Sequence, residues 1–271
     1  MTLAACAAAA LIGGPTHAAD ASAWTDDTYS AIRLIAGASK SGADNLRAGI
    51  EIKMQPGWHT YWRYPGDSGV PPRFSFAGSD NLAAAKVLFP APHAFTDEAG
   101  TTIGYKNSII FPVRVIPLKK DRPVTLRAKI DYAVCEKLCV PAEARIELTI
   151  PAAGGADNTA LDAAEARVPE PISAAVAGLT AKRASDDKIK PLVFVDLAAP
   201  TGAPVELFVE GPSPEWALPI PKPASGAPAG RAHFSFELDG LPPGVDPSGS
   251  YELTFTIVQG DHATEVKTHL D

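Results

Sequence analysis

Apolar and polar residues alternate along much of this chain with the period of two that is typical of β-strands. The alternation is clearest at residues 46–54, 124–134 and 144–150 of the first half, and it returns at residues 232–238 and 251–258. The 22 glycines and 26 prolines supply turn residues between such runs. Short alternating runs separated by turns predict many short strands, and therefore an all-β fold.

Two tandem immunoglobulin-like β-sandwiches are the architecture that these runs predict. Between residues 24 and 151 about seven short antiparallel strands follow one another with frequent turns, as in an immunoglobulin-like sandwich. A flexible Pro/Gly segment and a short helical pattern come next, and strand-like runs then resume. We therefore expect a leader at residues 1–18, a first sandwich at 19–152, a linker with a short helix at 153–170 and a second sandwich at 171–271.

Composition and charge narrow the classes of partner. With 271 residues the chain can form one large core or two of ordinary size, and its 46% hydrophobic content is that of a folded protein. The net charge of −7 argues against nucleic acid or an anionic membrane surface as the partner. No internal apolar run approaches the roughly 18 residues of a membrane helix, so we expect no transmembrane segment in the mature chain.

The N-terminus has the pattern of an export signal. Residues 3–14 are apolar and rich in alanine, and Ala18 ends a Thr-His-Ala sequence that resembles a signal-peptidase site. A lipoprotein signal ending at Cys6 is less favoured, because too little apolar sequence precedes that cysteine. We therefore expect a signal peptide over residues 1–18 and export into an oxidising compartment, which leaves two of the three cysteines in the mature protein.

Those two cysteines, Cys135 and Cys139, lie where one alternating run ends and the next begins. Two strands joined by residues 136–138 form a hairpin with a cysteine at the end of each arm. Opposed residues of a non-hydrogen-bonded antiparallel pair have Cα atoms about 4.5 Å apart, within disulfide range. A helix would also bring positions i and i+4 together, but Pro141 and the flanking alternation argue against it. The sequence predicts a bridgeable pair on a hairpin.

Two roles remain open for this pair from the residues alone. A disulfide that only staples the fold is common in exported proteins, but a loop this short is worth only about 2 kcal/mol in the chain-entropy model. A short bridge near the surface is also the kind that exchanges with an attacking thiolate. The alternatives are therefore a structural disulfide and a redox-active one.

Other chemistry has weaker support in the sequence. His59 and His93 could approach the cysteines and complete a copper or zinc site, but nothing in the sequence brings them together. No nucleophile elbow indicates a serine hydrolase. We therefore expect neither a metal nor an organic cofactor. The aromatic run at residues 58–64 must direct rings to both faces of a strand, so its outward rings are candidates for a functional edge.

Several motifs of the first half occur together in one known family. They are Gly57-Trp-His-Thr-Tyr-Trp-Arg63, Pro65-Gly-Asp-Ser-Gly69, Pro71-Pro72, Phe89-Pro90-x-Pro92, Gly104-Tyr105 and Tyr132-x-x-Cys135-x-x-x-Cys139-x-Pro141. In this combination the chain resembles, over about residues 25–150, the periplasmic N-terminal domain of the DsbD thiol:disulfide interchange proteins. The resemblance is closer still to the suppressor-of-copper-sensitivity B (ScsB) branch, whose periplasmic region carries two immunoglobulin-like modules.

This resemblance implies a thiol:disulfide oxidoreductase that relays electrons in the periplasm. In the family, a membrane-embedded donor reduces the cysteine pair, the pair reduces thioredoxin-like proteins, and a cap shields the pair until a partner docks. Carried over residue by residue, Cys135 and Cys139 are the redox pair. The expected cap residues are Phe95, Asp97, Glu98, Thr102, Ile103 and Tyr105, and the expected aromatic strand beside the site contains Trp58, Tyr61 and Trp62.

The sequence departs from the family pattern in two ways. Three residues separate the cysteines, where better-known members have a longer gap, and the chain carries neither the membrane domain nor the C-terminal thioredoxin domain of those proteins. We therefore expect a monomer that works with a separate membrane donor. The competing hypothesis is a periplasmic binding or adaptor module with a permanent disulfide, for which Cu(I) is the candidate ligand and copper tolerance the candidate role.

Overall fold

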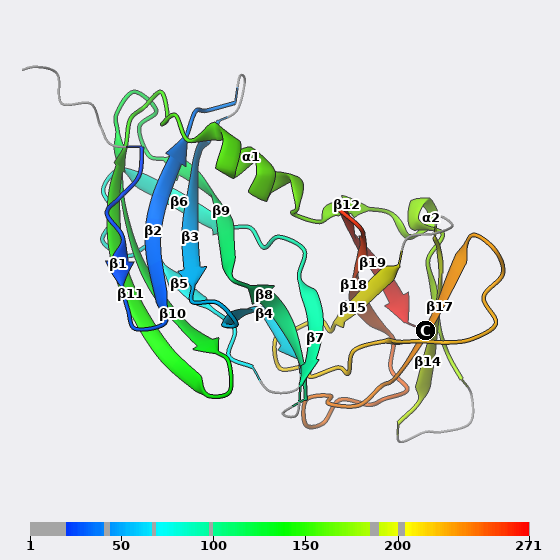
Figure 1. Cartoon of the computed structure of the whole chain (residues 1–271). Helices are drawn as coiled ribbons and strands as arrows, with labels where there is room; N and C mark the ends of the chain where they lie inside the picture. Colours follow the sequence, from blue (N-terminus) through cyan, green and yellow to red (C-terminus); the bar gives the residue numbers. More distant parts are fainter. Residues whose placement is uncertain are drawn as a thin grey trace, which may run out of the picture.

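In the part of the chain that the structure describes, four β-sheets are packed as two sandwiches that lie side by side (Figure 1). The computed structural model describes residues 20–40, 44–66, 69–97, 100–184, 190–199 and 204–270. Strands dominate these residues, which confirms the predicted all-β, immunoglobulin-like architecture. The predicted signal peptide at residues 1–18 lies outside the described residues.

The first sandwich consists of a five-stranded and a six-stranded sheet. In spatial order the five-stranded sheet contains β1 (Thr25–Asp26), β2 (Ser30–Gly37), β3 (Leu46–Met54), β9 (Ser108–Pro117) and β6 (Leu82–Val87). The six-stranded sheet contains β11 (Cys139–Ile150), β10 (Val124–Cys135), β4 (His59–Gly66), β8 (Gly100–Lys106) and β7 (His93–Asp97), with β5 (Arg73–Ser75) paired to β10. The strands β11 and β7 are therefore the two edges of the sheet that carries the cysteines.

Alternation along β10 explains why it is an interior strand. Val124, Leu126 and Ile130 are fully buried and belong, with Phe111 of β9, to one apolar cluster between the two sheets. Burial of each such side chain stabilises the fold by about 1.5–3 kcal/mol. Thr125, Arg127 and Lys129 alternate with these core residues and lie on the opposite face of the strand, the face that carries Cys135 at its end.

The segment 93–106, which contains the expected cap residues, shows no clear strand alternation in the sequence. It is an antiparallel hairpin, in which β7 pairs with β8 and β8 pairs with β4. Gly100 and Gly104 weaken the strand pattern of β8, since they take two of the positions on the face opposite to Ile103 and Tyr105. At Gly104 the backbone approaches β4 so closely that a Cβ atom would lie 2.1 Å from the carbonyl oxygen of Thr60.

Helix α1 (Asn158–Ala166) packs against the first sandwich. The side chain of Leu161 is fully buried, and it fits there because Gly37 and Gly49 have no side chains: a Cβ atom at either glycine would come within 2.8 Å of Leu161. Arg47 of β3 also forms ion pairs with Asp162 and Glu165 of the helix. The segment that we expected to be a linker is thus partly built into the first sandwich.

The second sandwich consists of two four-stranded sheets with a separate apolar core. One sheet contains β12 (Glu170–Ile172), β19 (His262–Leu270), β18 (Tyr251–Gln259) and β15 (Val205–Glu210). The other contains β13 (Thr180–Arg183), β14 (Leu192–Ala198), β17 (Arg231–Glu237) and β16 (Lys222–Pro223), and the short helix α2 (Ala174–Ala177) precedes β13. Among the described residues, no helix has the length and apolar character that crossing a bilayer requires.

Candidate functional site

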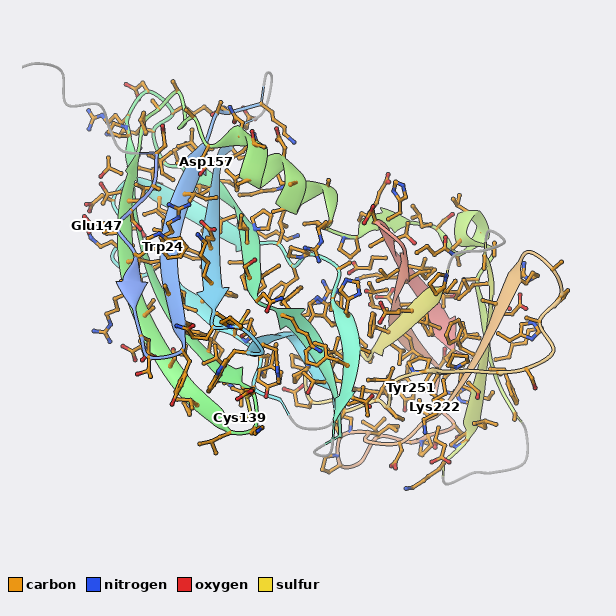
Figure 2. The ribbon with its side chains drawn as sticks, viewed as in Figure 1. Trp24, Cys139, Glu147, Asp157, Lys222 and Tyr251 are labelled. Carbon is orange, nitrogen blue, oxygen red and sulfur yellow. A yellow bond between two sulfur atoms is a disulfide. The ribbon has the colours of Figure 1, made fainter. Side chains whose placement is uncertain are left out.

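The two cysteines form the last residue pair of the β10–β11 hairpin. Each strand has 12 residues, and the ladder continues in register from Val124 opposite Ile150 to Cys135 opposite Cys139. The Cα atoms of the two cysteines are 4.2 Å apart, and their sulfur atoms form a disulfide. Figure 2 shows Cys139 at the end of the hairpin that lies far from Asp157. The predicted bridgeable pair on a hairpin is therefore present.

The two halves of the disulfide differ in accessibility. Cys135 is only 2% exposed, whereas Cys139 and the three residues between them are exposed. The difference follows from the strand order, because β10 has neighbours on both sides and β11 is an edge strand. At the tip, Leu138 is 71% exposed, which is unusual for a large apolar side chain. An incoming group can therefore reach the Cys139 side of the bond first.

Tyr61 of β4 contacts both sulfur atoms. Its hydroxyl oxygen lies 2.7 Å from Cys135 Sγ and 3.1 Å from Cys139 Sγ, so it donates its hydrogen bond toward the disulfide. The tyrosine is 2% exposed and forms a small buried cluster with Cys135 and Ala133. The loop after β4 covers its ring, because a Cβ atom on Gly69 would come within 2.6 Å of the ring. The hydroxyl is thus held at the sulfurs.

His59, two residues before Tyr61, lies opposite Cys135 in the β4–β10 register. Its imidazole is buried and packs edge-on against the ring of Tyr61, with 5.6 Å between ring centroids, and against the ring of Phe95, with 4.9 Å. Lys106 Nζ lies 4.5 Å from the centroid of Phe95. Strand β7 therefore places an aromatic ring, with a cation above it, against His59, the residue opposite the buried cysteine.

The other expected site residues lie in different places. Trp62 and Ile103 are fully buried in the core, on the face of the sheet opposite to the disulfide. Tyr105 is also in the core; its hydroxyl donates to the carbonyl oxygen of Pro90, and its burial raises the pKa of the phenol. Trp58, just before β4, stacks on Tyr29 with 3.9 Å between ring centroids.

The polar part of the expected cap is described only in part. Thr102 is buried in β8, opposite Phe95 of β7. Asp97 ends β7, but its side chain lies outside the described part of the structure, as does the whole of Glu98. Of the expected cap, Phe95 is thus the residue whose contacts lead to the cysteines, through His59.

From the sequence, His59 was a candidate only as a metal ligand, and Lys106 was not a candidate site residue. The signal for His59 was the alternation at the start of β4, which puts it on the same face as Tyr61, and Lys106 lies opposite His59 in the β4–β8 register. His93, the second candidate ligand, hydrogen-bonds Glu206 of the second sandwich instead. Among the described residues, no group of three or more His, Cys, Asp and Glu side chains is gathered as a metal site.

Comparison with known proteins identifies a protein family and similar solved structures. Residues 33–151 match the protein family described as "Thiol:disulfide interchange protein DsbD, N-terminal". The fold is similar to the crystal structure of the N-terminal periplasmic domain of ScsB from Proteus mirabilis, with a TM-score of 0.69 and 17% sequence identity. That alignment covers 93% of this chain and 98% of the ScsB chain, so the likeness includes both sandwiches. No match was found among curated protein sequences.

Proposed function

Because residues 33–151 belong to the N-terminal domain family of the DsbD thiol:disulfide interchange proteins, we propose that this chain relays electrons in the periplasm by thiol–disulfide exchange at Cys135 and Cys139. One observation carries the proposal most directly: the disulfide joins a buried sulfur to an exposed one at the tip of a hairpin. A bridge that only stabilises the fold gains nothing from that asymmetry. An exchanging bridge needs one accessible sulfur and one protected sulfur.

The exchange takes place in two balanced steps. The thiolate of Cys139 attacks one sulfur of a partner's disulfide; a mixed disulfide forms, and the partner's other sulfur leaves as a thiolate. The thiolate of Cys135 then attacks Cys139 Sγ, restores the Cys135–Cys139 bond and releases the partner's second thiolate. Two electrons pass to the partner, and a donor returns the pair to the dithiol by the reverse sequence.

The difference in exposure between the two cysteines supports this order of steps. Cys139 lies on the edge strand and meets the partner, while Cys135 lies within reach of Cys139 but away from solvent. Tyr61 supports the buried member of the pair, because a hydroxyl hydrogen bond to a thiolate is charge-assisted and stronger than one to a neutral sulfur. No cofactor takes part in this chemistry.

The partners follow from the same family relation. We propose a thioredoxin-like periplasmic protein as acceptor and a separate membrane protein as donor. Phe95 of β7, packed on His59, takes the shielding role of the cap on the Cys135 side. The exposed Leu138 lies beside the attacking sulfur, where it offers a docking partner an apolar contact.

A trapping experiment tests the proposal. The Cys135→Ala variant, mixed with an oxidised thioredoxin-fold protein, is expected to accumulate a mixed disulfide through Cys139, because the resolving thiol is missing. Cys139→Ala is the matched control and is expected to accumulate much less. The reduction potential of the wild-type pair is measured alongside. A potential below about −300 mV, together with no trapped complex, would indicate the permanent disulfide of a binding module instead.

A further inference from the structure

Strand β4 connects the disulfide to the second sandwich. His59 lies opposite Cys135, Tyr61 contacts the sulfurs, and beyond Tyr61 the register of β4 with β8 shifts before the strand reaches the second sandwich. Arg63 reaches away from the site, with its Nε 2.9 Å from Glu210 Oε1 and its Nη2 2.7 Å from Glu210 Oε2. The same Nη2 lies 2.6 Å from Glu265 Oε2. Four residues after His59, the strand is thus fixed to two carboxylates of the other sandwich.

Strand β7 is held by a second contact with the same sandwich. Glu206 of β15 accepts a hydrogen bond from the backbone N–H of Ala94 at 3.0 Å, and its other carboxylate oxygen lies 2.8 Å from Nδ1 of His93. Because β7 is an edge strand, this N–H points away from β8, and Glu206 occupies the position of a missing neighbour strand. The next residue is Phe95, whose ring packs on His59.

The pKa values of the pair agree with this geometry. The hydrogen bond with Glu206 raises the pKa of His93, against the effects of burial and of the nearby Arg167. Burial works to raise the pKa of Glu206, but the hydrogen bonds from His93 and from the Ala94 N–H outweigh it and leave that pKa lowered. The charged form of each partner therefore stabilises the other.

Apolar packing makes the interface continuous between the two polar contacts. Trp62, on the core face of β4, packs against Phe208 of β15 with 5.8 Å between ring centroids. Phe208 and Val258 of the second sandwich belong to the buried apolar cluster of the first. Tyr64 also donates a hydrogen bond to the carbonyl oxygen of Leu218. Figure 1 shows β7 on the side of the first sandwich that faces β15.

We propose that the second sandwich controls access to the buried half of the redox pair, with Glu206 as a positioning residue that holds β7, and so Phe95, over His59 and Cys135. The proposal rests on the exchange function above. It gives the second sandwich a role in the reaction through residues such as Glu206, whose hydrogen bonds described above are with β7 and not with the sulfurs. If the Glu206 carboxylate is removed, the backbone of β7 loses its hydrogen bond at Ala94, and Phe95 moves away from His59 more often. We call Phe95 in its packed position the cover over Cys135.

Labelling of Cys135 by iodoacetamide measures this cover directly. In a Cys139→Ser background Cys135 is a free thiol, and its labelling rate is measured as a function of pH. The plateau of the rate at high pH reports how accessible the thiolate is, and the midpoint of the curve reports the pKa of the thiol. Glu206→Ala is expected to raise the plateau by about three- to tenfold, the worth of one partly exposed hydrogen bond to a charged group. Glu206→Gln is expected to lie between, because its amide oxygen can still accept from the Ala94 N–H.

The matched control is Glu252→Ala, which removes another ion pair of the second sandwich, with Lys267 at 3.5 Å. It is expected to leave the labelling rate unchanged. Hydrogen exchange of the β7 and β8 amides is measured on the same proteins, to show whether the hairpin itself opens. A Glu206→Ala plateau equal to wild type, or an equal rise in Glu252→Ala, would overturn the proposal, and Glu206→Gln still tests it if the alanine variant does not fold.

The two proposals fail in different ways. Iodoacetamide labelling needs no physiological partner, so it reports on the cover whatever the protein reduces. If no mixed disulfide forms in the Cys135→Ala trap but Glu206→Ala still exposes Cys135, the exchange function is wrong and the coupling between sandwiches stands. If trapping succeeds and Glu206→Ala changes neither the labelling nor the hydrogen exchange, the positioning role of Glu206 is wrong.

Discussion

Replacement of Tyr61 by phenylalanine tests the chemistry of the site most sharply. The change removes one hydroxyl, 2.7 Å from Cys135 Sγ, and leaves the buried ring in place. The hydroxyl stabilises a thiolate more than a disulfide sulfur, because its hydrogen bond to a charged acceptor is the stronger one. Its loss therefore destabilises the reduced form, and the disulfide of Tyr61→Phe becomes harder to reduce.

The size of the effect follows from the energy of that bond. Hydrogen bonds to charged groups contribute about 1.5–3 kcal/mol. For a two-electron couple about 30 mV corresponds to 1.4 kcal/mol. Because the hydroxyl also makes a weaker hydrogen bond to the disulfide, the reduction potential of Tyr61→Phe is expected to fall by at most about 30–60 mV. Equilibration with a dithiothreitol redox series measures this potential. The shift is expected to grow as pH rises, since more of the reduced pair is then thiolate.

Tyr132→Phe is the matched control for this measurement. Tyr132 is a buried tyrosine of β10 whose hydroxyl lies 2.7 Å from Ser30 Oγ, on the core face and away from the sulfurs. Its removal is expected to lower the free energy of unfolding by about 1 kcal/mol and to leave the potential unchanged. An unchanged potential in Tyr61→Phe, or an equal shift in Tyr132→Phe, would refute the role given to the Tyr61 hydroxyl.

Three further predictions follow from the contacts described above. Leu138→Ser is expected to slow exchange with a thioredoxin-like partner about tenfold, through loss of apolar burial on docking, while reduction by dithiothreitol keeps its rate; equal slowing of both would contradict a docking role. Leu161→Ala is expected to cost about 2–5 kcal/mol in urea unfolding, because the cavity opens between α1 and the sheet, and a cost near zero would mean that the helix is not part of the first core. The contribution of the His93–Glu206 contact to stability is expected to be largest between about pH 4.5 and 6.5, the ordinary pKa values of the two groups. Because the pKa of His93 is raised, its contribution to stability is complete below its ordinary pKa and is lost as pH rises through the raised pKa. Because the pKa of Glu206 is lowered, its contribution to stability is complete above its ordinary pKa and is lost as pH falls through the lowered pKa. Thermal melts of wild type and Glu206→Gln across this range measure the difference, and a difference independent of pH would contradict an ionic contact.

The sheet architecture could be predicted because the alternation that specifies it is local. Residues 46–54 and 124–134 alternate cleanly, and they form β3 and most of β10. Strands β7 and β8 are not apparent in the sequence because Gly100 and Gly104 take two of the positions of β8 where polar side chains usually complete the pattern. The glycine at position 104 is required by the close approach of β4, which is a tertiary constraint that the local sequence does not display.

The site was predicted in part for a similar reason. The family resemblance places a cap between residues 95 and 105, but strand parity decides which of its side chains face the sulfurs. Phe95 lies on the disulfide side, whereas Ile103 and Tyr105 lie in the core. The contacts of Arg63 and His93 with the second sandwich join residues more than 100 positions apart. In the sequence, a charged residue of an alternating strand gives the same pattern whether its side chain contacts solvent or another domain.

The two edges of the cysteine-bearing sheet have different uses, and this division connects the proposed reaction to the whole fold. The β7 edge is occupied, since Glu206 of the second sandwich accepts the outward N–H of Ala94. The β11 edge carries exposed charged residues such as Glu143 and Arg145 along its length, and such side chains discourage pairing with another strand. At its first residue, however, β11 presents Cys139, with Leu138 just before it. A partner can therefore approach the exposed sulfur without displacing the second sandwich, and the cover over Cys135 stays in place while the mixed disulfide forms.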